Sequence, residues 1–492
     1  MFSYKKHIYY INFRMLLRVI GYLLVIESLF LLIPTIFATC YREKELLDFI
    51  ICAGITGGCG GILMLLRPRT KDMGKREGIL LTGLTWVILS IFGMLPFLLT
   101  KTHLSVCDAF FETMSGFTTT GASVLNTLAG VPKSILVWRC VVQWVGGLGI
   151  ILFTLAVVPM LNYTGGMQLF NAEVTGITRD KLQPRVSYTA KGLWAIYIAL
   201  TVSLIILLSF SEMDFFDAFC HGLSTMSTGG FSTNDMNISQ WDSNYIKIVL
   251  CVFMFMGGVN FSLLFNIING KGYNPFRNTA FKYYVWMIAI CYLGFVINIF
   301  IEKLPHDLKS LTIDSLFQTV SILSSTGITE PDFRDWGSLS IVILLIMMVM
   351  GACAGSTSGG AKIDRFVVLF KFLKNEFYKM MHPNSVTTVT INGKGTANAI
   401  VQKTLAFLFL YILVIFAGGL ALSMMGLPLY DAFFYSLSAI SNTGLGTEVT
   451  GITANYALIP DLAKWTLALI MLIGRLEIFT VLLIFTPTFW RK

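Results

Sequence analysis

Long apolar stretches recur along the whole chain, and short polar segments separate them. A helix needs ~20 apolar residues to cross the hydrocarbon core of a bilayer, and these stretches are about that long. The pattern therefore predicts an all-α polytopic membrane protein. We expect spans at 19–39, 47–66, 78–100, 134–161, 191–210, 244–268, 281–301, 338–350 resuming beyond a break to 375, 400–425 and 463–487.

One short sequence motif occurs four times, each time between two predicted spans, and in every copy an aspartate lies thirteen residues before a glycine. The copies are Asp108–Gly121, Asp217–Gly230, Asp314–Gly327 and Asp431–Gly444. From the Asp to the eighth or ninth residue after it, a helix would be ~14 Å long, about half the hydrocarbon core. We expect a half-spanning pore helix with the Asp as its N-cap, followed by a non-helical turn at membrane depth.

The four copies divide the chain into four helix–pore-helix–helix repeats. Two N-terminal transmembrane helices occupy 1–70, and repeats 1 to 4 occupy 71–165, 166–275, 276–385 and 386–492. Four like segments can surround one axis, where small residues ending in Gly let backbone carbonyls approach an ion. The negative ends of the four pore helices favour a cation at that axis.

The predicted ion filter takes three residues from the turn of each repeat. These residues are Thr119, Thr120, Gly121, Thr228, Gly229, Gly230, Ser325, Thr326, Gly327, Asn442, Thr443 and Gly444. Close packing of helices is the alternative explanation for small residues within a membrane. Four copies in one register favour the pore over that alternative.

Repeat 3 contains a second irregularity, a polar and glycine-rich break within its last span. The break covers 351–360, and we predict that it forms a gating loop below the filter. Its candidate gating residues, with an arginine of the last span, are Gly351, Gly355, Ser356, Thr357, Gly359, Gly360 and Arg475. An arginine inside a span normally faces a polar partner or a cavity. The alternative is that Arg475 and Glu477 form a packing pair without a role in gating.

Composition and charge narrow the class of protein further. Apolar residues make up 55% of the chain and charged residues 13%, which excludes a soluble domain. The net charge of +9 is concentrated in alternate loops, above all 67–76 and 362–403, whereas the acidic residues gather in the others. This distribution follows the positive-inside rule, so we expect cytoplasmic termini, an acidic outer face and no binding of nucleic acid. The nine cysteines are scattered, and neither they nor the histidines form a catalytic constellation, so we expect no enzyme.

Several segments resemble the superfamily of K⁺ transporters that includes the Trk, Ktr and HKT proteins, and the TrkH/TrkG family most closely. They are the four filter turns and the segments GACAGSTSGGAKIDR, WVGGLGIILFTLAVVPML (144–161), GGMQLFNAEVTG (165–176), GGVNFSLLFN (257–266) and GRLEIFTVLLIF (474–485). Ala352 and Ser358 depart from the family pattern, because glycine is expected at both places in the loop.

The resemblance implies a K⁺ uptake protein of the bacterial inner membrane, surrounded by lipid and usually a homodimer. It implies K⁺ as the transported ion, no organic cofactor on this chain, and a TrkA-like cytoplasmic subunit that binds nucleotide and controls opening. Glycine in all four turns predicts a preference for K⁺ over Na⁺. The competing hypothesis is a Na⁺- or H⁺-coupled K⁺ symporter with Glu27 or Glu477 as a proton site. We expect only one broken span, which argues against that alternative.

Overall fold

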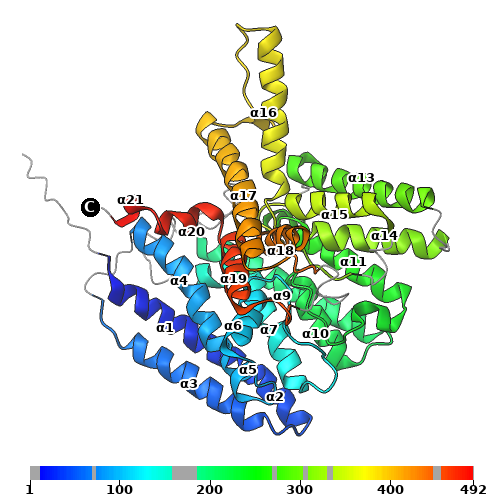
Figure 1. Cartoon of the computed structure of the whole chain (residues 1–492). Coiled ribbons are helices and arrows are strands. Elements are labelled where there is room, and N and C mark those ends of the chain that lie inside the picture. Colours follow the sequence, from blue (N-terminus) through cyan, green and yellow to red (C-terminus); the bar gives the residue numbers. More distant parts are fainter. Residues whose placement is uncertain are drawn as a thin grey trace, which may run out of the picture.

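The computed structural model describes residues 11–68, 74–157, 186–268, 274–302, 308–329, 336–446 and 456–490, and these are almost entirely helical (Figure 1). Three helices precede the repeats: α1 (Phe13–Phe30), α2 (Leu32–Cys40) and α3 (Leu46–Met64). Helices α1 and α3 cross closely because both have glycine at the crossing. A Cβ on Gly21 would lie 2.7 Å from the Gly60 carbonyl oxygen.

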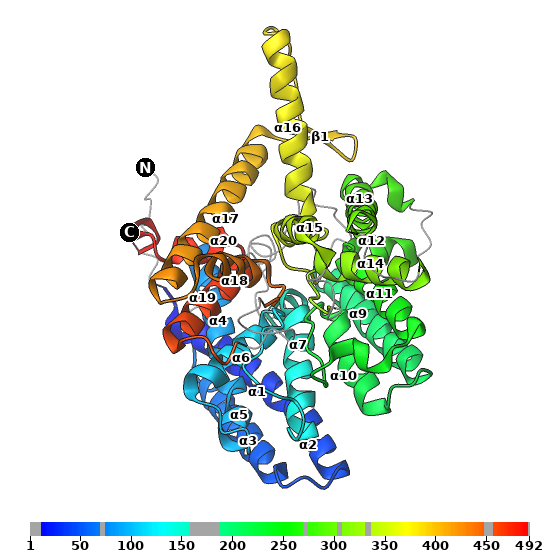
Figure 2. The same cartoon turned by 45° about the vertical axis from the view of Figure 1, so that its right-hand side comes forward.

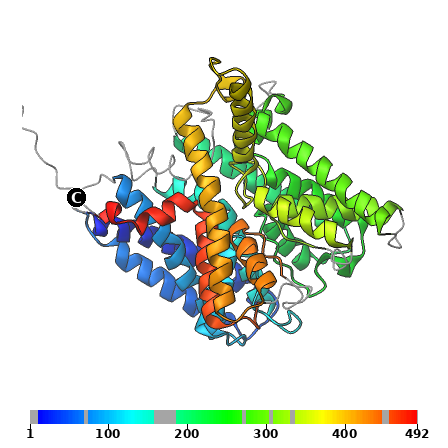
Figure 3. The ribbon, with the colours of Figure 1, turned by 45° about the horizontal axis from the view of Figure 1, so that its top comes forward.

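The four repeats follow in chain order, and each contains a pore helix with further helices before and after it. Repeat 1 has α4 (Lys75–Gly93), α5 (Leu95–Leu99), the pore helix α6 (Val106–Phe117) and α7 (Lys133–Val157). Repeat 2 has α9 (Val186–Ser209), the pore helix α10 (Phe215–Met226), η1 (Asn237–Trp241), α11 (Asn244–Gly258) and α12 (Phe261–Ile268). The blue N-terminal helices lie on the opposite side of the molecule from the green helices of repeats 2 and 3 (Figure 3).

Repeats 3 and 4 carry the largest irregularities. Repeat 3 has η2 (Pro275–Arg277), α13 (Thr279–Ile301), the pore helix α14 (Leu308–Leu323), α15 (Ser338–Met350) and α16 (Ile363–Met381). Repeat 4 has α17 (Asn398–Met424), the pore helix α18 (Leu429–Ser441), α19 (Asp461–Arg475), α20 (Ile478–Ile484) and α21 (Pro487–Trp490). Helix α16 projects from the body, beside a hairpin of β1 (Thr390–Ile391) and β2 (Lys394–Gly395) (Figure 2).

The expectation of a single broken span is wrong. Six described helices are long and apolar enough to cross a membrane, and two bent pairs bring the number to eight if each pair is one span. Helices α11 and α12 meet at 103°, and α19 and α20 meet at 120°. At the first bend Asn260 lies between the two helices and caps α12, since its Oδ1 accepts a hydrogen bond from Ser262 N at 2.8 Å. At the second bend Glu477 has a positive φ of 64°, which no α-helix can contain.

The predicted N-cap role of the repeated aspartates is also wrong. In repeats 1, 2 and 4 the Asp is the third helical residue, and α14 begins still earlier, at Leu308. Ser105 is the N-cap of α6, because its Oγ accepts from Asp108 N at 3.1 Å and donates to the Asp108 carboxylate at 2.8 Å. Two of the aspartates join neighbouring repeats instead. Asp108 binds Lys464 at 2.6 Å, and Asp314 binds Lys247 at 2.8 Å.

Candidate functional site

The four filter turns have the same backbone conformation. The residue two positions before each glycine is left-handed, with φ of 54°, 54°, 53° and 52° at Thr119, Thr228, Ser325 and Asn442. This region is uncommon for any residue except glycine, and it is strained for β-branched threonine. Such strain persists only where the surroundings enforce it, and it is concentrated at functional sites.

The same two hydrogen bonds attach each turn to the end of its pore helix. In repeat 1, Thr119 N binds Gly116 O at 2.9 Å and Thr120 N binds Ser115 O at 2.8 Å. These bonds define a Schellman motif, which satisfies carbonyls that the helix end would leave unpaired. The second bond recurs with lengths of 2.9, 2.8 and 3.1 Å in the other three repeats, from Gly229, Thr326 and Thr443 to Ser224, Ser321 and Ser438. The serine seven residues after each Asp therefore supplies a carbonyl that anchors the filter turn.

The four filter glycines close a ring. A Cβ on Gly121 would overlap the carbonyl oxygen of Gly229, in the turn of repeat 2. The same overlap recurs between each repeat and the next. A Cβ on Gly230 would overlap Thr326 O of repeat 3, one on Gly327 would overlap Thr443 O of repeat 4, and one on Gly444 would overlap Thr120 O of repeat 1. The glycine φ angles of 82°, 81°, 74° and 71° also disfavour any side chain. The structure thus brings all twelve predicted filter residues into one layer of backbone.

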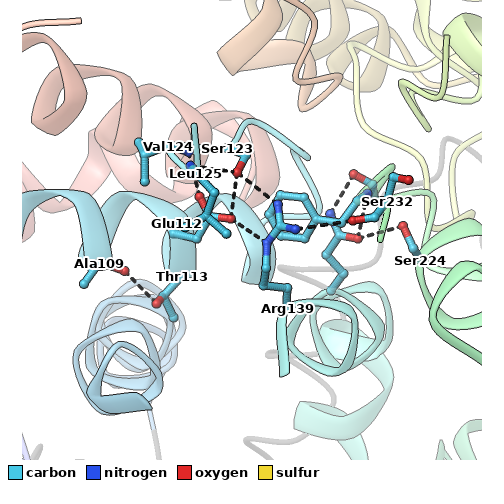
Figure 4. Close-up of polar contacts among 12 residues, drawn as sticks. Ala109, Glu112, Thr113, Ser123, Val124, Leu125, Arg139, Ser224 and Ser232 are labelled. Carbon is cyan, nitrogen blue, oxygen red and sulfur yellow. Dashed lines mark hydrogen bonds and ion pairs between the residues drawn. The ribbon is translucent and has the colours of Figure 1, made fainter. Parts of the chain in front are cut away.

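A buried ion pair next to this ring connects two of its turns, and the sequence reasoning missed it (Figure 4). Glu112 of α6 binds Arg139 Nε of α7 at 2.7 Å, and both side chains are almost wholly buried. Glu112 also accepts from Val124 N at 2.8 Å, while Arg139 donates to Ser123 Oγ at 2.9 Å and to Ser232 O at 3.3 Å. Since residues 123 and 232 each lie two positions after a filter glycine, the pair joins the turns of repeats 1 and 2.

The predicted gating loop, 351–360, lies against the filter layer. Its Gly359 N donates to Ser325 Oγ at 2.5 Å, and Ser358 Oγ lies 2.9 Å from the same hydroxyl. Gly360 N donates to Ser441 O of repeat 4 at 2.9 Å, and Thr357 Oγ1 donates to Gly257 O of repeat 2 at 3.1 Å. The loop therefore contacts turns or helices of three repeats at once.

Three glycines give this loop its backbone conformation. The two residues that depart from the family pattern, Ala352 and Ser358, are both buried. Gly351, Gly355 and Gly360 all have positive φ, of 64°, 76° and 75°. Ala352 is fully buried, and the hydroxyl of Ser358 is one of the two loop groups that contact Ser325 of the filter turn. Ser356 Oγ donates within the loop, to Cys353 O at 2.6 Å.

Arg475 joins the loop to repeat 1. Its Nη1 donates to Thr357 O at 2.8 Å, and its Nη2 donates to Gly146 O of repeat 1 at 2.9 Å. Glu477, the packing partner considered for it, forms an ion pair with Arg365, whose guanidinium also lies over the Phe407 ring.

The loop has a second cationic partner, because Lys362 is buried and its Nζ donates to Ser358 O. Lys362 lies two residues after the glycine-rich run, at the start of the basic segment 362–403.

Glu27, a proton site in the symport hypothesis, borders a cavity of ~50 Å³ that none of the twelve predicted filter residues lines. The cavity is lined by Trp86, Phe117 and Trp138 among others, and it reaches Gly146. Within the described part of the chain, neither carboxylate oxygen of Glu27 has a hydrogen-bond partner. The described residues also contain no group of three His, Cys, Asp or Glu side chains that could hold a metal ion.

Comparison with known proteins gives matches along nearly the whole chain. The model of the TrkH family, described as a cation transport protein, matches residues 59–492. The Trk system potassium uptake protein TrkH of Escherichia coli K12 is 36% identical over 493 residues, which cover 98% of this chain and 100% of that protein. TrkG of the same organism is 32% identical over 491 residues, covering 97% of this chain and 99% of that protein.

A solved structure extends this similarity to the fold. The crystal structure of the potassium transporter TrkH from Vibrio parahaemolyticus superimposes with a TM-score of 0.87 at 34% identity. The match covers 97% of this chain and 100% of that one. The segment 165–176, which contributed to the resemblance, lies outside the described residues.

Proposed function

Because the chain belongs to the TrkH family, a family of cation transporters rather than of enzymes, we propose that it takes up K⁺ through the ring of filter turns. The closed ring of four turns with one backbone conformation is the observation that carries this proposal. Such a ring offers carbonyl oxygens from four sides, which can replace the water around a cation. The membrane potential then drives K⁺ inward with ~2.3 kcal/mol per charge per 100 mV.

The gate in this proposal is the loop 351–360, held by Arg475. A guanidinium has five donors in a rigid plane, so one side chain can hold carbonyls of both the loop and α7. Two hydrogen bonds of Arg475 do this, since they end on Thr357 O and Gly146 O. Opening would break these bonds and release the loop from the filter layer.

The partners and orientation of the chain belong to the same proposal. We place the chain in a bacterial inner membrane, among lipid, as a homodimer with both termini in the cytoplasm. A TrkA-like nucleotide-binding subunit would dock on the basic segment 362–403. This segment includes α16, which projects from the body of the molecule (Figure 1). Copurification with such a subunit, and a response to nucleotide only in its presence, would support this arrangement. Nucleotide regulation of the purified chain alone would contradict it.

Coupled K⁺ symport is the second candidate function, and one observation favours it. The buried carboxylate of Glu27 has no hydrogen-bond partner among the described residues, and such a group can exchange a proton. The channel is favoured because the cavity of Glu27 lies between the N-terminal helices and repeat 1, and no predicted filter residue lines it.

Ion flux through purified protein in liposomes tests the proposal. We expect K⁺ and Rb⁺ to permeate better than Na⁺ or Li⁺, and the flux to reverse at the potential set by the K⁺ gradient alone. Reversal that shifts with the pH or Na⁺ gradient would indicate symport instead. Equal Na⁺ and K⁺ flux would contradict the filter itself.

A further inference from the structure

The filter turn of repeat 2 lacks a side chain that the other three turns have. Repeats 1, 3 and 4 place threonine directly before the glycine, and its hydroxyl binds the hydroxyl two residues earlier. The three oxygen–oxygen distances are 2.8, 2.7 and 2.9 Å, for Thr118–Thr120, Ser324–Thr326 and Ser441–Thr443. Repeat 2 has Gly229 at this place, so its Ser227 can form no such pair.

Gln143 of α7 fills the missing volume. Its side chain is completely buried. A Cβ on Gly229 would lie 2.5 Å from Gln143 Cδ and 2.7 and 2.8 Å from Oε1 and Nε2. A side chain at position 229 and the glutamine therefore exclude each other, which explains why only this repeat has glycine before the filter glycine.

The surroundings fix the orientation of the Gln143 amide. Its oxygen faces Phe231 N at 3.2 Å and Ser224 Oγ at 2.9 Å. A backbone N–H can only donate, so the group next to it must be the amide oxygen. The Nε2 donors are then on the other side, where one of them binds the carbonyl oxygen of Gly229 at 2.7 Å.

That carbonyl belongs to the ring, since it is the oxygen that a Cβ on Gly121 would overlap. Among the residues that the structure describes, the equivalent carbonyls of Thr120, Thr326 and Thr443 accept no hydrogen bond. The ring thus has three free carbonyls and one that is shared with an amide. A shared carbonyl offers less electron density to an ion, and the field strength of the carbonyls is one determinant of selectivity between K⁺ and Na⁺.

We propose that Gln143 is a specificity-determining residue, whose amide weakens and orients one carbonyl of the filter so that the ring prefers the larger ion. This inference rests on the proposed function of the ring. It goes beyond that function because it assigns part of the selectivity to a side chain outside the four turns. The alternative is that Gln143 only fills space.

Two variants separate these roles. Gln143→Ala removes both the amide and the volume, whereas Gln143→Ala with Gly229→Thr returns the volume and the hydroxyl that the other repeats have. The ratio of K⁺ to Na⁺ flux in liposomes should fall about fivefold in both variants, because both lack the amide donor. Thermal unfolding should show the double variant closer to the unmodified protein than the single variant.

The control removes a buried amide elsewhere. Asn298 of α13 is buried and donates to Trp336 O and to Ser340 Oγ, neither of which belongs to a filter turn, so Asn298→Leu should leave the flux ratio unchanged. An unaltered flux ratio in the folded double variant would overturn the inference, because Gln143 would then only fill space. If Gln143→Ala does not fold, the double variant alone decides. Lack of K⁺ preference in the unmodified protein would instead refute the proposed function.

Discussion

The four filter turns share one backbone conformation, whereas the four segments that follow them across the membrane have four different shapes. Helix α7 runs without a break, α11 and α12 meet at 103°, α19 and α20 meet at 120°, and α15 and α16 are separated by the loop. A ring that surrounds an ion needs equivalent oxygens on every side. A gate needs only one element that moves, so the segments below the ring are free to differ.

These four segments nevertheless share one small feature. Each places a glycine against the end of a pore helix or the turn that follows it, at Gly146, Gly257, Gly359 and Gly474. The next residue is again glycine in repeats 1 to 3, but in repeat 4 it is Arg475. The arginine therefore stands where the other repeats have no side chain, and its guanidinium reaches the loop. The four similar filter turns and the single predicted gating loop thus meet at one register position.

The largest effect is expected when the buried ion pair of Glu112 and Arg139 beside the ring is broken. Glu112→Gln leaves Arg139 buried without its carboxylate, and breaking such a pair costs ~3–5 kcal/mol. We expect a loss of stability of that order in the free energy of unfolding, measured in detergent micelles. Lys379→Gln is the matched control, because its pair with Glu376 is well exposed and should contribute under ~1 kcal/mol. Equal stability of the two variants would show that the buried pair does not support the turns.

The next prediction breaks the ring itself. Gly121→Ser places a side chain at a φ of 82° and against the Gly229 carbonyl, where strain and overpacking together cost ~2–4 kcal/mol. The K⁺ to Na⁺ flux ratio should fall more than tenfold. Gly130→Ser is the control, since Gly130 has a φ of 84° with nothing within 4 Å of its added Cβ. An unchanged ratio in folded Gly121→Ser protein would remove the glycine ring from the explanation of selectivity.

A third prediction tests the contact between Arg475 and the loop, which only repeat 4 provides. Arg475→Ala removes the charged hydrogen bonds to Thr357 O and Gly146 O, and a shift of ~1.4 kcal/mol changes the open-to-closed ratio tenfold. We expect about tenfold higher K⁺ flux in liposomes without a partner subunit, and an intermediate value for Arg475→Lys. The flux ratio of K⁺ to Na⁺ should stay as in the unmodified protein. Unaltered or abolished flux in folded Arg475→Ala protein would place the gate elsewhere.

The sequence predicted the repeated parts of this molecule better than the unique ones. Four copies in one register identified the pore helices, the turns and the glycines, because each copy supported the others. The N-cap was misassigned because the motif shows that an Asp lies near a helix start, while the start itself depends on neighbours such as Ser105. The bend at Asn260 was missed because the residues on both sides are apolar enough to form one span.

The supporting side chains could not be found by the same reasoning. Glu112 and Arg139 are 27 residues apart, and nothing in the sequence states that they meet. A signal for Gln143 did exist, since Gly229 is the one place where the filter motif lacks a threonine. The missing volume had to be filled from another helix, but only the packing of α7 shows which residue fills it.

The smallest effect is expected at Glu27 of α1, which tests whether transport depends on a group outside the four repeats. Glu27→Leu removes a buried carboxylate whose oxygens have no hydrogen-bond partner among the described residues. Replacing an unpaired polar group by an apolar one should raise the free energy of unfolding by ~1–2 kcal/mol, because the cavity is lined mainly by aromatic and aliphatic groups. In the channel proposal K⁺ flux and its dependence on pH stay as they are, since the ring contains no part of α1. Glu477→Gln is the comparison, because it breaks the ion pair with Arg365 and should destabilise the protein. A Glu27→Leu protein that folds but loses a pH-driven component of K⁺ uptake would favour the proton-coupled symporter and move part of the mechanism into the N-terminal helices.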